Sequence, residues 1–246
     1  MTEIRTDARP IRIEVRAMNM NDINLTMEQL RREYGQVIGI YEAAIREINA
    51  RLQTLDAEFS LRHRHNPIHH IESRVKTLPS IVRKLHSISC PISISSAKKV
   101  LHDIAGVRVV CCYVDDIYTI ANLLLSQDDI QLILEKDYIK NPKPNGYRSL
   151  HIVVDVPVYQ LQGKLFVPVE IQIRTVAMDF WATLEHGIRY KASEEVPQSI
   201  VEQLRGCADV ITETDYKMQE IFKVLQNVND KPDESPESIV REEREK

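Results

Sequence analysis

Glycine is scarce in this sequence of 246 residues, and so are cysteine and tryptophan. The seven glycines are scattered along the chain, so neither the Walker motif nor the glycine-rich fingerprint of dinucleotide-binding domains can be written anywhere. A protein of this composition that bound nucleotides would therefore hold their phosphates with side chains rather than with a glycine-rich loop.

Long apolar runs are also missing. No stretch approaches the roughly 18–20 consecutive apolar residues that cross a bilayer, and charges interrupt residues 1–16. We therefore expect a cytoplasmic protein without a membrane partner.

The four cysteines form no C-x-x-C pair. Cys111 and Cys112 are adjacent, so they point to opposite faces if they lie on a strand. A disulfide framework or a thiolate zinc site is therefore not indicated, and we interpret Cys90, Cys111, Cys112 and Cys207 as buried free thiols.

Neither sign of charge dominates, since 32 Lys and Arg oppose 36 Asp and Glu for a formal net charge of −4. With 43% hydrophobic residues the chain can bury a globular core. Residues 229–246 hold seven acids, four bases and two prolines, and we interpret them as an acidic disordered tail. The rest of the chain is close to neutral, so a surface that binds phosphate must come from local clustering of basic side chains.

The hydrophobic spacing predicts one domain that mixes helices and strands. Thr26 and Gln29 form a capping box in front of an amphipathic helix that continues to about residue 57. We further expect helices at 71–85, from about 95, at 117–125, at 175–191 and at 197–228, and strands at 103–114, 130–134, 147–158 and 165–174. The fold class is α+β: a mixed β-sheet flanked by helices, with helical extensions at both ends. The domain is residues 25–228 and follows a flexible extension, residues 1–24.

Local signals set several boundaries within this domain. Asp115 and Asp116 are expected to cap the helix at 117–125, and Thr175 the helix that follows the last strand. Gln162 and Gly163 are typical of a hairpin turn between the two longest strands.

The last predicted strand alternates strictly between apolar and polar residues. Val169, Ile171 and Ile173 form one face, and Glu170, Gln172 and Arg174 form the other. The pattern alone favours an amphipathic strand with a solvated face. It also presents a carboxylate, an amide and a guanidinium in one row, which a ligand could use.

A second polar group lies at the start of the strand predicted at 103–114. Asp103 precedes Gly106, where a ligand could approach the backbone closely, and Arg108 is unusual within an apolar run. Asp103 is a candidate ligand for a hard cation such as Mg²⁺, which takes one or two carboxylates together with substrate phosphates. Its alternative role is a simple turn or helix cap.

Basic residues cluster in the helix predicted at 71–85. Lys76, Ser80 and Lys84 are four residues apart and would share one face, with Arg74 on an adjoining edge. A polyphosphate would relieve the repulsion between these like charges. A solvated basic face is an equally good interpretation, and the acidic net charge argues against binding of duplex nucleic acid.

The segment 140–151 combines a rigid turn with an aromatic and basic group. Tyr147 at the loop edge is suited to stacking on a base, although a strand Tyr or His is more often a packing residue. His63, His65, His69 and His70 have metal-like spacing, but neighbouring arginines would repel a cation. We therefore favour a surface loop over a zinc site.

Together these segments resemble the successive motifs of the RelA/SpoT-type (p)ppGpp synthetase domain, and the chain length resembles that of the small alarmone synthetases. The resemblance covers about residues 70–191. The motifs are Arg74-Val-Lys76 with Ser80 and Lys84, Asp103-Ile-Ala-Gly-Val-Arg108, Lys136-Asp-Tyr-Ile139, Asn141-Pro-Lys-Pro-Asn-Gly-Tyr-Arg-Ser-Leu-His151, Glu170-Ile-Gln-Ile-Arg-Thr175 and Trp181-Ala-Thr-Leu-Glu-His186.

The resemblance implies a nucleotidyltransferase-like fold and an enzyme of the stringent response without hydrolase activity. The implied reaction transfers the pyrophosphate of ATP to the 3′-hydroxyl of GDP or GTP and releases AMP. Carried over by position, Asp103 and Glu170 bind Mg²⁺, and Glu170 orients or deprotonates the 3′-hydroxyl. The implied ATP contacts are Arg74 and Arg108 on the adenine, and Lys76, Ser80 and Lys84 on the phosphates.

The acceptor site implied by the resemblance is centred on Tyr147, which stacks on guanine. The residues implied near the acceptor or its phosphates are Lys136, Lys143, His151, Gln172 and Arg174. The family also implies a homotetramer formed through the terminal helices, with a possible allosteric alarmone site between subunits.

Two other functions remain open at this point. One is a non-catalytic nucleotide-binding regulator that keeps the fold. The other is a single-stranded RNA-binding protein that uses the basic helix and the His/Arg loop. Preference for GDP or GTP, the allosteric ligand and zinc sensitivity are not determined by the sequence.

Overall fold

The computed structural model describes residues 20–191 and 196–229. Most of the N-terminal extension and the acidic tail proposed above lie outside the described residues. No helix in the described part of the chain is long and apolar enough to cross a membrane.

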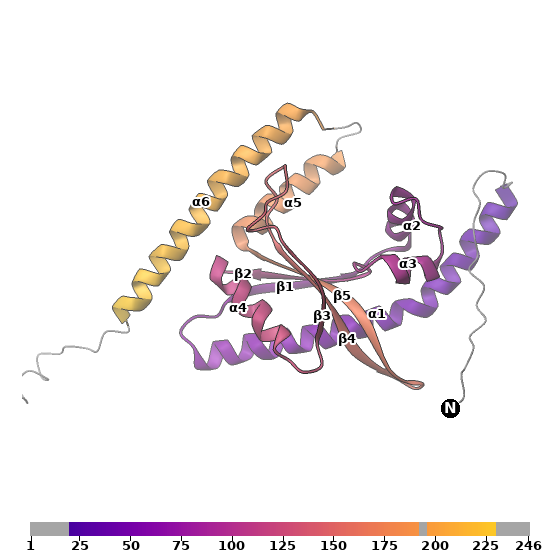
Figure 1. Ribbon diagram of the computed structural model, residues 1–246, viewed down its shortest axis with the longest axis horizontal. Helices are drawn as coiled ribbons and strands as arrows, with labels where there is room; N and C mark the ends of the chain where they lie inside the picture. Colours follow the sequence, from indigo (N-terminus) through magenta and orange to yellow (C-terminus); the bar gives the residue numbers. More distant parts are fainter. Residues whose placement is uncertain (1–19, 192–195, 230–246) are drawn as a thin grey trace, which may run out of the picture.

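A five-stranded mixed sheet forms the centre of the molecule (Figure 1). Its strands are β1 (Ile68–Val75), β2 (Ala105–Cys111), β3 (Gln131–Asp137), β4 (Leu150–Gln160) and β5 (Gly163–Thr175), in the spatial order β1-β2-β5-β4-β3. β2 and β5 are parallel, whereas the other neighbouring pairs are antiparallel. The predicted α+β class with a mixed sheet is confirmed.

The long helix α1 (Met20–Arg62) crosses one face of this sheet. It contacts β1, β2, β4 and β5, and its side chains Tyr41, Ala44, Ile48 and Leu52 are buried against them at the spacing of one helical face. The helix begins six residues before the predicted capping residue Thr26, which therefore lies inside it.

The core lies between α1, α4 (Val114–Leu125) and the inner face of the sheet. Val169, Ile171 and Ile173 of β5 are fully buried in this core. The strict alternation along β5 is thus confirmed as an inside and outside pattern, so Glu170 and Gln172 lie on the opposite face, which carries the polar groups.

The helix predicted at 71–85 is wrong. Residues up to Val75 form β1, which pairs with β2, and a separate helix α2 (Leu78–Ser87) follows. A continuous helix would have placed Pro79 in its interior at a cost of about 3 kcal/mol, whereas Pro79 is tolerated in the first turn of α2. Arg74, Lys76 and Lys84 therefore do not share one helical face.

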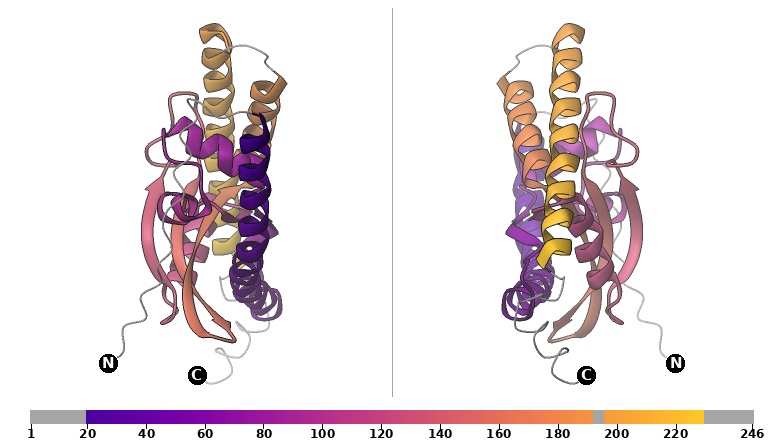
Figure 2. Two further views of the ribbon diagram at one scale, coloured as in Figure 1. Left: turned by 90° about the vertical axis from the view of Figure 1, so that its right-hand side faces the viewer. Right: turned by 90° about the vertical axis from the view of Figure 1, so that its left-hand side faces the viewer.

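The remaining helices agree in position with the predicted ones. They are α3 (Ile94–Val100), α4, α5 (Val176–Lys191) and α6 (Gln198–Asn229), and α5 packs beside α6 at one end of the molecule (Figure 2). Thr175 caps α5 as expected, since its hydroxyl accepts a hydrogen bond from the Met178 amide at 3.1 Å. The prediction that Asp115 and Asp116 cap α4 is wrong, because the helix begins at Val114 and contains both. Its capping residue is Tyr113, whose amide donates to Asp116 at 3.0 Å.

Two smaller differences concern β4 and the cysteines. β4 begins at Leu150 rather than at Tyr147, because the preceding residues form the loop of the site described below. All four cysteines are free, but only Cys111 is buried and Cys207 is exposed, so the expectation of buried thiols holds for one of them alone.

Candidate active site

The register of the sheet brings predicted site residues from separate segments into rows on its outer face. In one row Arg74 of β1 lies opposite Gly106 of β2, which lies opposite Glu170 of β5. The next row on the same face lies two residues further along each strand. It contains Glu72, Arg108, Gln172, His151 and Lys136. Residues from β1 to β3 therefore face the same space.

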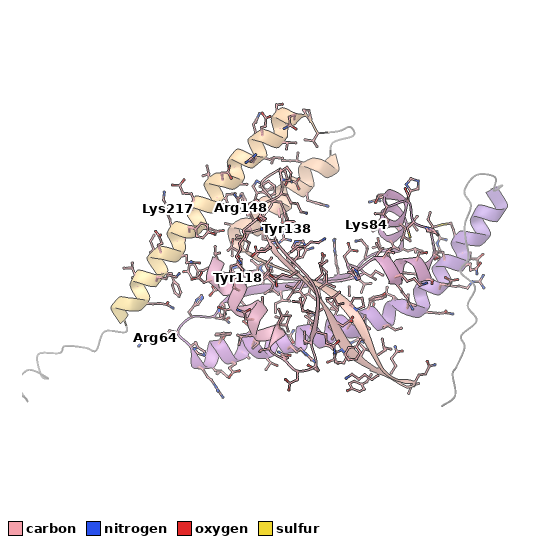
Figure 3. The ribbon with its side chains drawn as sticks, in the orientation of Figure 1. Arg64, Lys84, Tyr118, Tyr138, Arg148 and Lys217 are labelled. Carbon is pink, nitrogen blue, oxygen red and sulfur yellow. The ribbon has the colours of Figure 1, made fainter. Side chains whose placement is uncertain are left out.

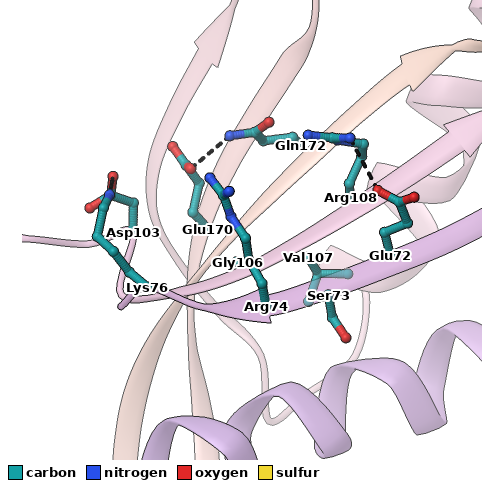
Figure 4. A pocket seen from close by; sticks show the side chains of 10 residues that line it. All are labelled: Glu72, Ser73, Arg74, Lys76, Asp103, Gly106, Val107, Arg108, Glu170 and Gln172. Carbon is teal, nitrogen blue, oxygen red and sulfur yellow. Dashed lines mark hydrogen bonds and ion pairs between the residues drawn. The ribbon is translucent and has the colours of Figure 1, made fainter. Parts of the chain in front are cut away.

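The first pocket, called here the carboxylate pocket, has a volume of about 370 Å³ (Figure 4). It is lined by Glu72, Ser73, Arg74, Lys76, Asp103, Gly106, Val107, Arg108, Glu170 and Gln172. Both predicted metal ligands and three of the five predicted ATP contacts thus line one cavity. Gly106 has no side chain to fill it, and a Cβ there would meet only the Arg74 carbonyl oxygen at 3.8 Å.

Opposite charges are paired around this pocket. The Lys76 ammonium contacts the Asp103 carboxylate, and Arg108 Nη1 lies 3.1 Å from Glu72 Oε2. A phosphate or a cation that entered the pocket would compete for these partners. Lys76 lies in the turn after β1, where its amide donates to the Ile104 carbonyl, which fixes the turn beside Asp103.

Glu170 is the most strongly perturbed carboxyl group of the pocket. Burial alone would raise its pKa, but a hydrogen bond and positive charge from His151, a hydrogen bond from Gln172 and the charge of Lys76 outweigh burial and lower the pKa to about 2. The distances are 3.3 Å from His151 Nδ1 to Oε1 and 2.9 Å from Gln172 Nε2 to Oε2. Glu170 is therefore a carboxylate at any physiological pH.

The second pocket, called here the aromatic pocket, has a volume of about 530 Å³. It is lined by Lys143, Pro144, Asn145, Tyr147, His151, Gln172, Glu185 and Val201. Gln172 lines both pockets, so the two cavities adjoin at its side chain. Two ligands bound in them would meet beside Glu170.

Tyr147 is held by two partners in the aromatic pocket. Its hydroxyl lies 2.8 Å from His151 Nε2 and accepts a hydrogen bond from Arg174 Nη2 at 3.3 Å. Lys143 Nζ lies 4.6 Å from the centroid of the Tyr147 ring and equally far from that of Tyr138. The pKa of Lys143 is lowered chiefly by burial, with the charges of Lys136 and Lys84 adding to the effect.

The loop that carries Lys143 and Tyr147 is shaped by its neighbours. The amides of Ile139 and Lys140 both donate to Asp137 Oδ1 at 3.0 Å, and Tyr118 donates to Asp137 Oδ2 at 3.1 Å. Gly146 has a φ of 90°, and a Cβ there would lie 2.6 Å from the Ala208 Cβ of α6. Only glycine fits where the loop touches α6.

Ser80, Lys84 and Lys136 line neither pocket. Ser80 lies in the first turn of α2, where its hydroxyl is 3.0 Å from that of Thr77. Lys84 is exposed on α2, and Figure 3 labels it together with Tyr138, above the sheet in that view. Lys84 and Lys136 nevertheless lie near enough to Lys143 to lower its pKa.

Several residues of the site carried no predicted role. They are Glu72, Asp137, Tyr138, Asp179 and Glu185. Asp137 and Tyr138 lie within a motif of the resemblance, and Glu185 within another, where it accepts a hydrogen bond from Asn145 Nδ2 at 2.9 Å. Only spatial neighbours identify Glu72 and Asp179 as site residues.

The histidine segment does not form a single surface loop. His69 and His70 lie on β1, and His65 is half-buried with its Nε2 2.9 Å from Asp116 Oδ2. In residues 20–191 and 196–229, no three His, Cys, Asp or Glu side chains are grouped to hold a metal ion.

Comparison with known proteins places the chain in a family. Residues 73–195 match the model for the region found in RelA/SpoT proteins. The GTP pyrophosphokinase YwaC of Bacillus subtilis is 40% identical over 211 residues, covering 86% of this chain and 99% of that protein. The GTP pyrophosphokinase YjbM of the same organism is 36% identical, covering 74% and 84% respectively.

Solved structures agree with this placement. The small alarmone synthetase 1 of B. subtilis, in complex with its product pppGpp, superposes with a TM-score of 0.74 at 34% identity, covering 79% of this chain and 98% of that one. A GTP pyrophosphokinase family protein from Streptococcus pneumoniae superposes with a TM-score of 0.73 at 34% identity, covering 80% and 96%. The chain therefore belongs to the RelA/SpoT family, within which it resembles the small alarmone synthetases.

Proposed function

We propose that this protein is an alarmone synthetase that transfers the pyrophosphate of ATP to the 3′-hydroxyl of GDP or GTP and releases AMP. In this proposal it is a cytoplasmic enzyme of the stringent response and has no hydrolase activity. The observation that carries the proposal is the pair of pockets that adjoin at Gln172 beside the ionised Glu170. A transfer between two nucleotides needs two adjoining binding sites, so that the reacting groups of donor and acceptor are held next to each other.

The carboxylate pocket is the proposed donor site. Arg74 and Arg108 project into it from adjacent strands, so two guanidinium groups are available to stack on adenine. Lys76 supplies positive charge to the polyphosphate at the same end as Asp103. Lys84 and Ser80 contact neither pocket wall, so we propose a phosphate role for them only at the rim.

The aromatic pocket is the proposed acceptor site. Tyr147 offers its ring to guanine, and Lys143 and His151 are placed to contact the phosphates or ribose of the acceptor. Arg174 holds the Tyr147 hydroxyl and accordingly positions the ring rather than the ligand. Lys136 of β3 lies opposite His151 of β4 and adds positive charge near this pocket.

Asp103 and Glu170 fit a Mg²⁺ ion by their chemistry, because both are carboxylates that line one cavity and both interact with Lys76, the proposed phosphate contact. Two protein oxygens leave room for substrate phosphates and water, as Mg²⁺ prefers. When bound, Mg²⁺ would neutralise charge on the transferred pyrophosphate. The ion would compete with Lys76 for Asp103.

The proposed chemistry joins the acceptor 3′-oxygen to the β-phosphorus of ATP and breaks the bond from that phosphorus to the oxygen bridging the α- and β-phosphates. The bridging oxygen leaves with AMP, and the hydroxyl proton passes to the departing AMP phosphate or to water. A carboxyl group with a pKa of about 2 is a weak proton acceptor and a good hydrogen-bond acceptor. We therefore propose that Glu170 orients the 3′-hydroxyl. Lys76, Arg74 and Arg108 stabilise the charge that develops on the phosphates.

The structure weakens the RNA-binding alternative. That alternative uses a basic helix over residues 71–85 together with the His/Arg loop, but residues up to Val75 form a strand, and His69 and His70 lie on the same strand. Two of the basic residues, Arg74 and Lys76, instead line a pocket together with Asp103 and Glu170. Paired carboxylates repel an RNA phosphate unless a cation lies between them, so this arrangement suits a nucleotide with Mg²⁺ better than RNA.

Replacement of either proposed metal ligand tests the assignment of the reaction. We expect Glu170→Gln and Asp103→Asn each to lower kcat for AMP release from ATP and GDP by about 100-fold or more, because each removes a charge at the transferred group. The measurement is chromatographic separation of AMP and the 3′-pyrophosphorylated product. Thermal unfolding serves as the control for folding, and near-wild-type turnover in either variant would contradict the proposal.

Tyr147→Ala tests stacking on the acceptor. Loss of the ring should raise the acceptor KM about tenfold or more, since stacking on a base is worth ~1–3 kcal/mol. Tyr147→Phe is the matched control, because it keeps the ring and loses only the contacts to His151 and Arg174. An unchanged acceptor KM in the alanine variant would exclude the aromatic pocket as the guanine site.

Gly106→Val tests the donor pocket without removing a charged group. The Cβ of the new side chain makes only an ordinary contact with the Arg74 carbonyl oxygen at 3.8 Å, and its methyl groups extend into the cavity that Gly106 lines. We therefore expect the fold to remain stable while the ATP KM rises about tenfold or more. Gly35→Ala, on the solvent side of α1, is the control for glycine replacement as such. A folded Gly106→Val enzyme with normal ATP affinity would place the donor elsewhere.

We also propose a homotetramer that assembles through the terminal helices. Exposed apolar side chains gather on α5 and α6: Phe180, Leu184, Ile188, Val210, Met218, Ile221, Val224 and Leu225. We expect light scattering to give four times the mass of 28.4 kDa, and Ile221→Glu with Val224→Glu to lower it. A mass unchanged by these charges would place the interface on another surface.

A further inference from the structure

Asp179 lines neither pocket but contacts one arginine beside each of them. It lies in the first turn of α5, and its side chain is 18% exposed. Its Oδ1 atom is 3.5 Å from Arg108 Nη1 and 3.4 Å from Arg174 Nη1. A single carboxylate oxygen therefore faces two guanidinium groups.

Both ion pairs are long and neither includes a hydrogen bond to Asp179 Oδ1. Asp179 Oδ1, Arg108 Nε and Arg174 Nε are all buried, and none of them has a hydrogen-bond partner. Buried polar atoms without partners are costly, by roughly 1–3 kcal/mol each. The cluster can thus gain hydrogen bonds if Asp179 moves fully onto one of the two arginines.

The two arginines serve different pockets. Arg108 lines the carboxylate pocket and pairs with Glu72 there. Arg174 is buried and donates hydrogen bonds to Gln172 at 2.6 Å and to the Tyr147 hydroxyl at 3.3 Å. Through these contacts Arg174 holds the wall between the pockets and the ring of the aromatic pocket.

We propose that Asp179 is a positioning residue that couples occupancy of the donor pocket to affinity in the acceptor pocket. A nucleotide in the carboxylate pocket engages Arg108 and draws it away from Asp179. The carboxylate then pairs fully with Arg174, which fixes Gln172 and Tyr147 for the acceptor. This inference rests on the proposed function for the identities of donor and acceptor.

The charges around Arg174 support this role. Burial lowers the pKa of Arg174, and the charge of Arg108 lowers it further, while Tyr147, Asp179 and Glu170 favour its charged form. Without Asp179, the buried Arg174 would face the partly exposed Arg108 with no carboxylate between the two like charges. Arg174 would then lose the anion that can hold it on Gln172 and Tyr147.

Binding of GDP, measured by calorimetry with and without α,β-methylene-ATP, tests the coupling, because this donor analogue cannot release its pyrophosphate. In the wild type we expect the analogue to tighten GDP binding about fivefold or more. In Asp179→Asn we expect the analogue to have no effect on the GDP Kd. The matched control is Asp129→Asn, which removes an acid that is paired with Arg51 of α1 and lines neither pocket, and which should keep the coupling.

A second variant is expected to bind GDP more tightly, whereas a variant that had lost its structure would bind GDP more weakly. Arg108→Gln frees Asp179 for Arg174 without any donor, so GDP alone should bind this variant as tightly as it binds the wild type with the analogue. Coupling retained in a folded Asp179→Asn, or no coupling in the wild type, would overturn the inference, as would unchanged or weaker GDP binding by Arg108→Gln. Release of AMP by the wild type tests the proposed function separately.

Discussion

The pairing of β5 with β2 on one side and β4 on the other is the constraint on which the site depends. It sets Glu170 level with Gly106 and Val153, and Gln172 level with Arg108 and His151. A slip of one residue would turn the polar row of β5 into the core and its apolar row outward. Because burial of the apolar row enforces this register, the same side chains that stabilise the fold also align the two proposed substrate sites.

Electrostatics at the centre of the site follow from that alignment. Glu170 is half-buried, which by itself would favour its neutral form, yet three neighbours keep it ionised: one on its own strand, one on the adjacent strand β4 and one in the turn after β1. His151 and Gln172 reach it because they occupy the next positions in the register, and Lys76 reaches it from the turn that contacts Asp103. The site therefore holds a fixed negative charge between groups of positive charge, an arrangement suited to moving a polyphosphate.

Sequence patterns were sufficient where one element decides the outcome. The alternation along β5, the hairpin between β4 and β5 and the cap at Thr175 are local, and the structure confirms each. The hairpin turn itself is Leu161 and Gln162, one residue earlier than predicted, and Gly163 begins β5. The prediction for the basic segment around Arg74 was wrong because an apolar spacing typical of a helix also fits a strand followed by a helix. Pro79 is the residue that distinguishes the two, since it belongs in the first turn of a helix. Asp179 could not be identified from sequence, since its partner Arg108 lies on a strand distant along the chain. Its other partner, Arg174, is close in sequence, but the change from strand to helix at Thr175 hides that contact from any periodic pattern.

One of the few glycines, Gly146, is required where the loop that carries Lys143 and Tyr147 contacts α6. Gly146 lets the loop lie against Ala208, and Arg148 reinforces that contact by donating to the Ala208 carbonyl and pairing with Asp209. The helix that carries much of the exposed apolar surface thus also supports the loop bearing Tyr147. A partner that shifted α6 would also move this loop, so the proposed assembly through α6 would change affinity at the proposed acceptor site.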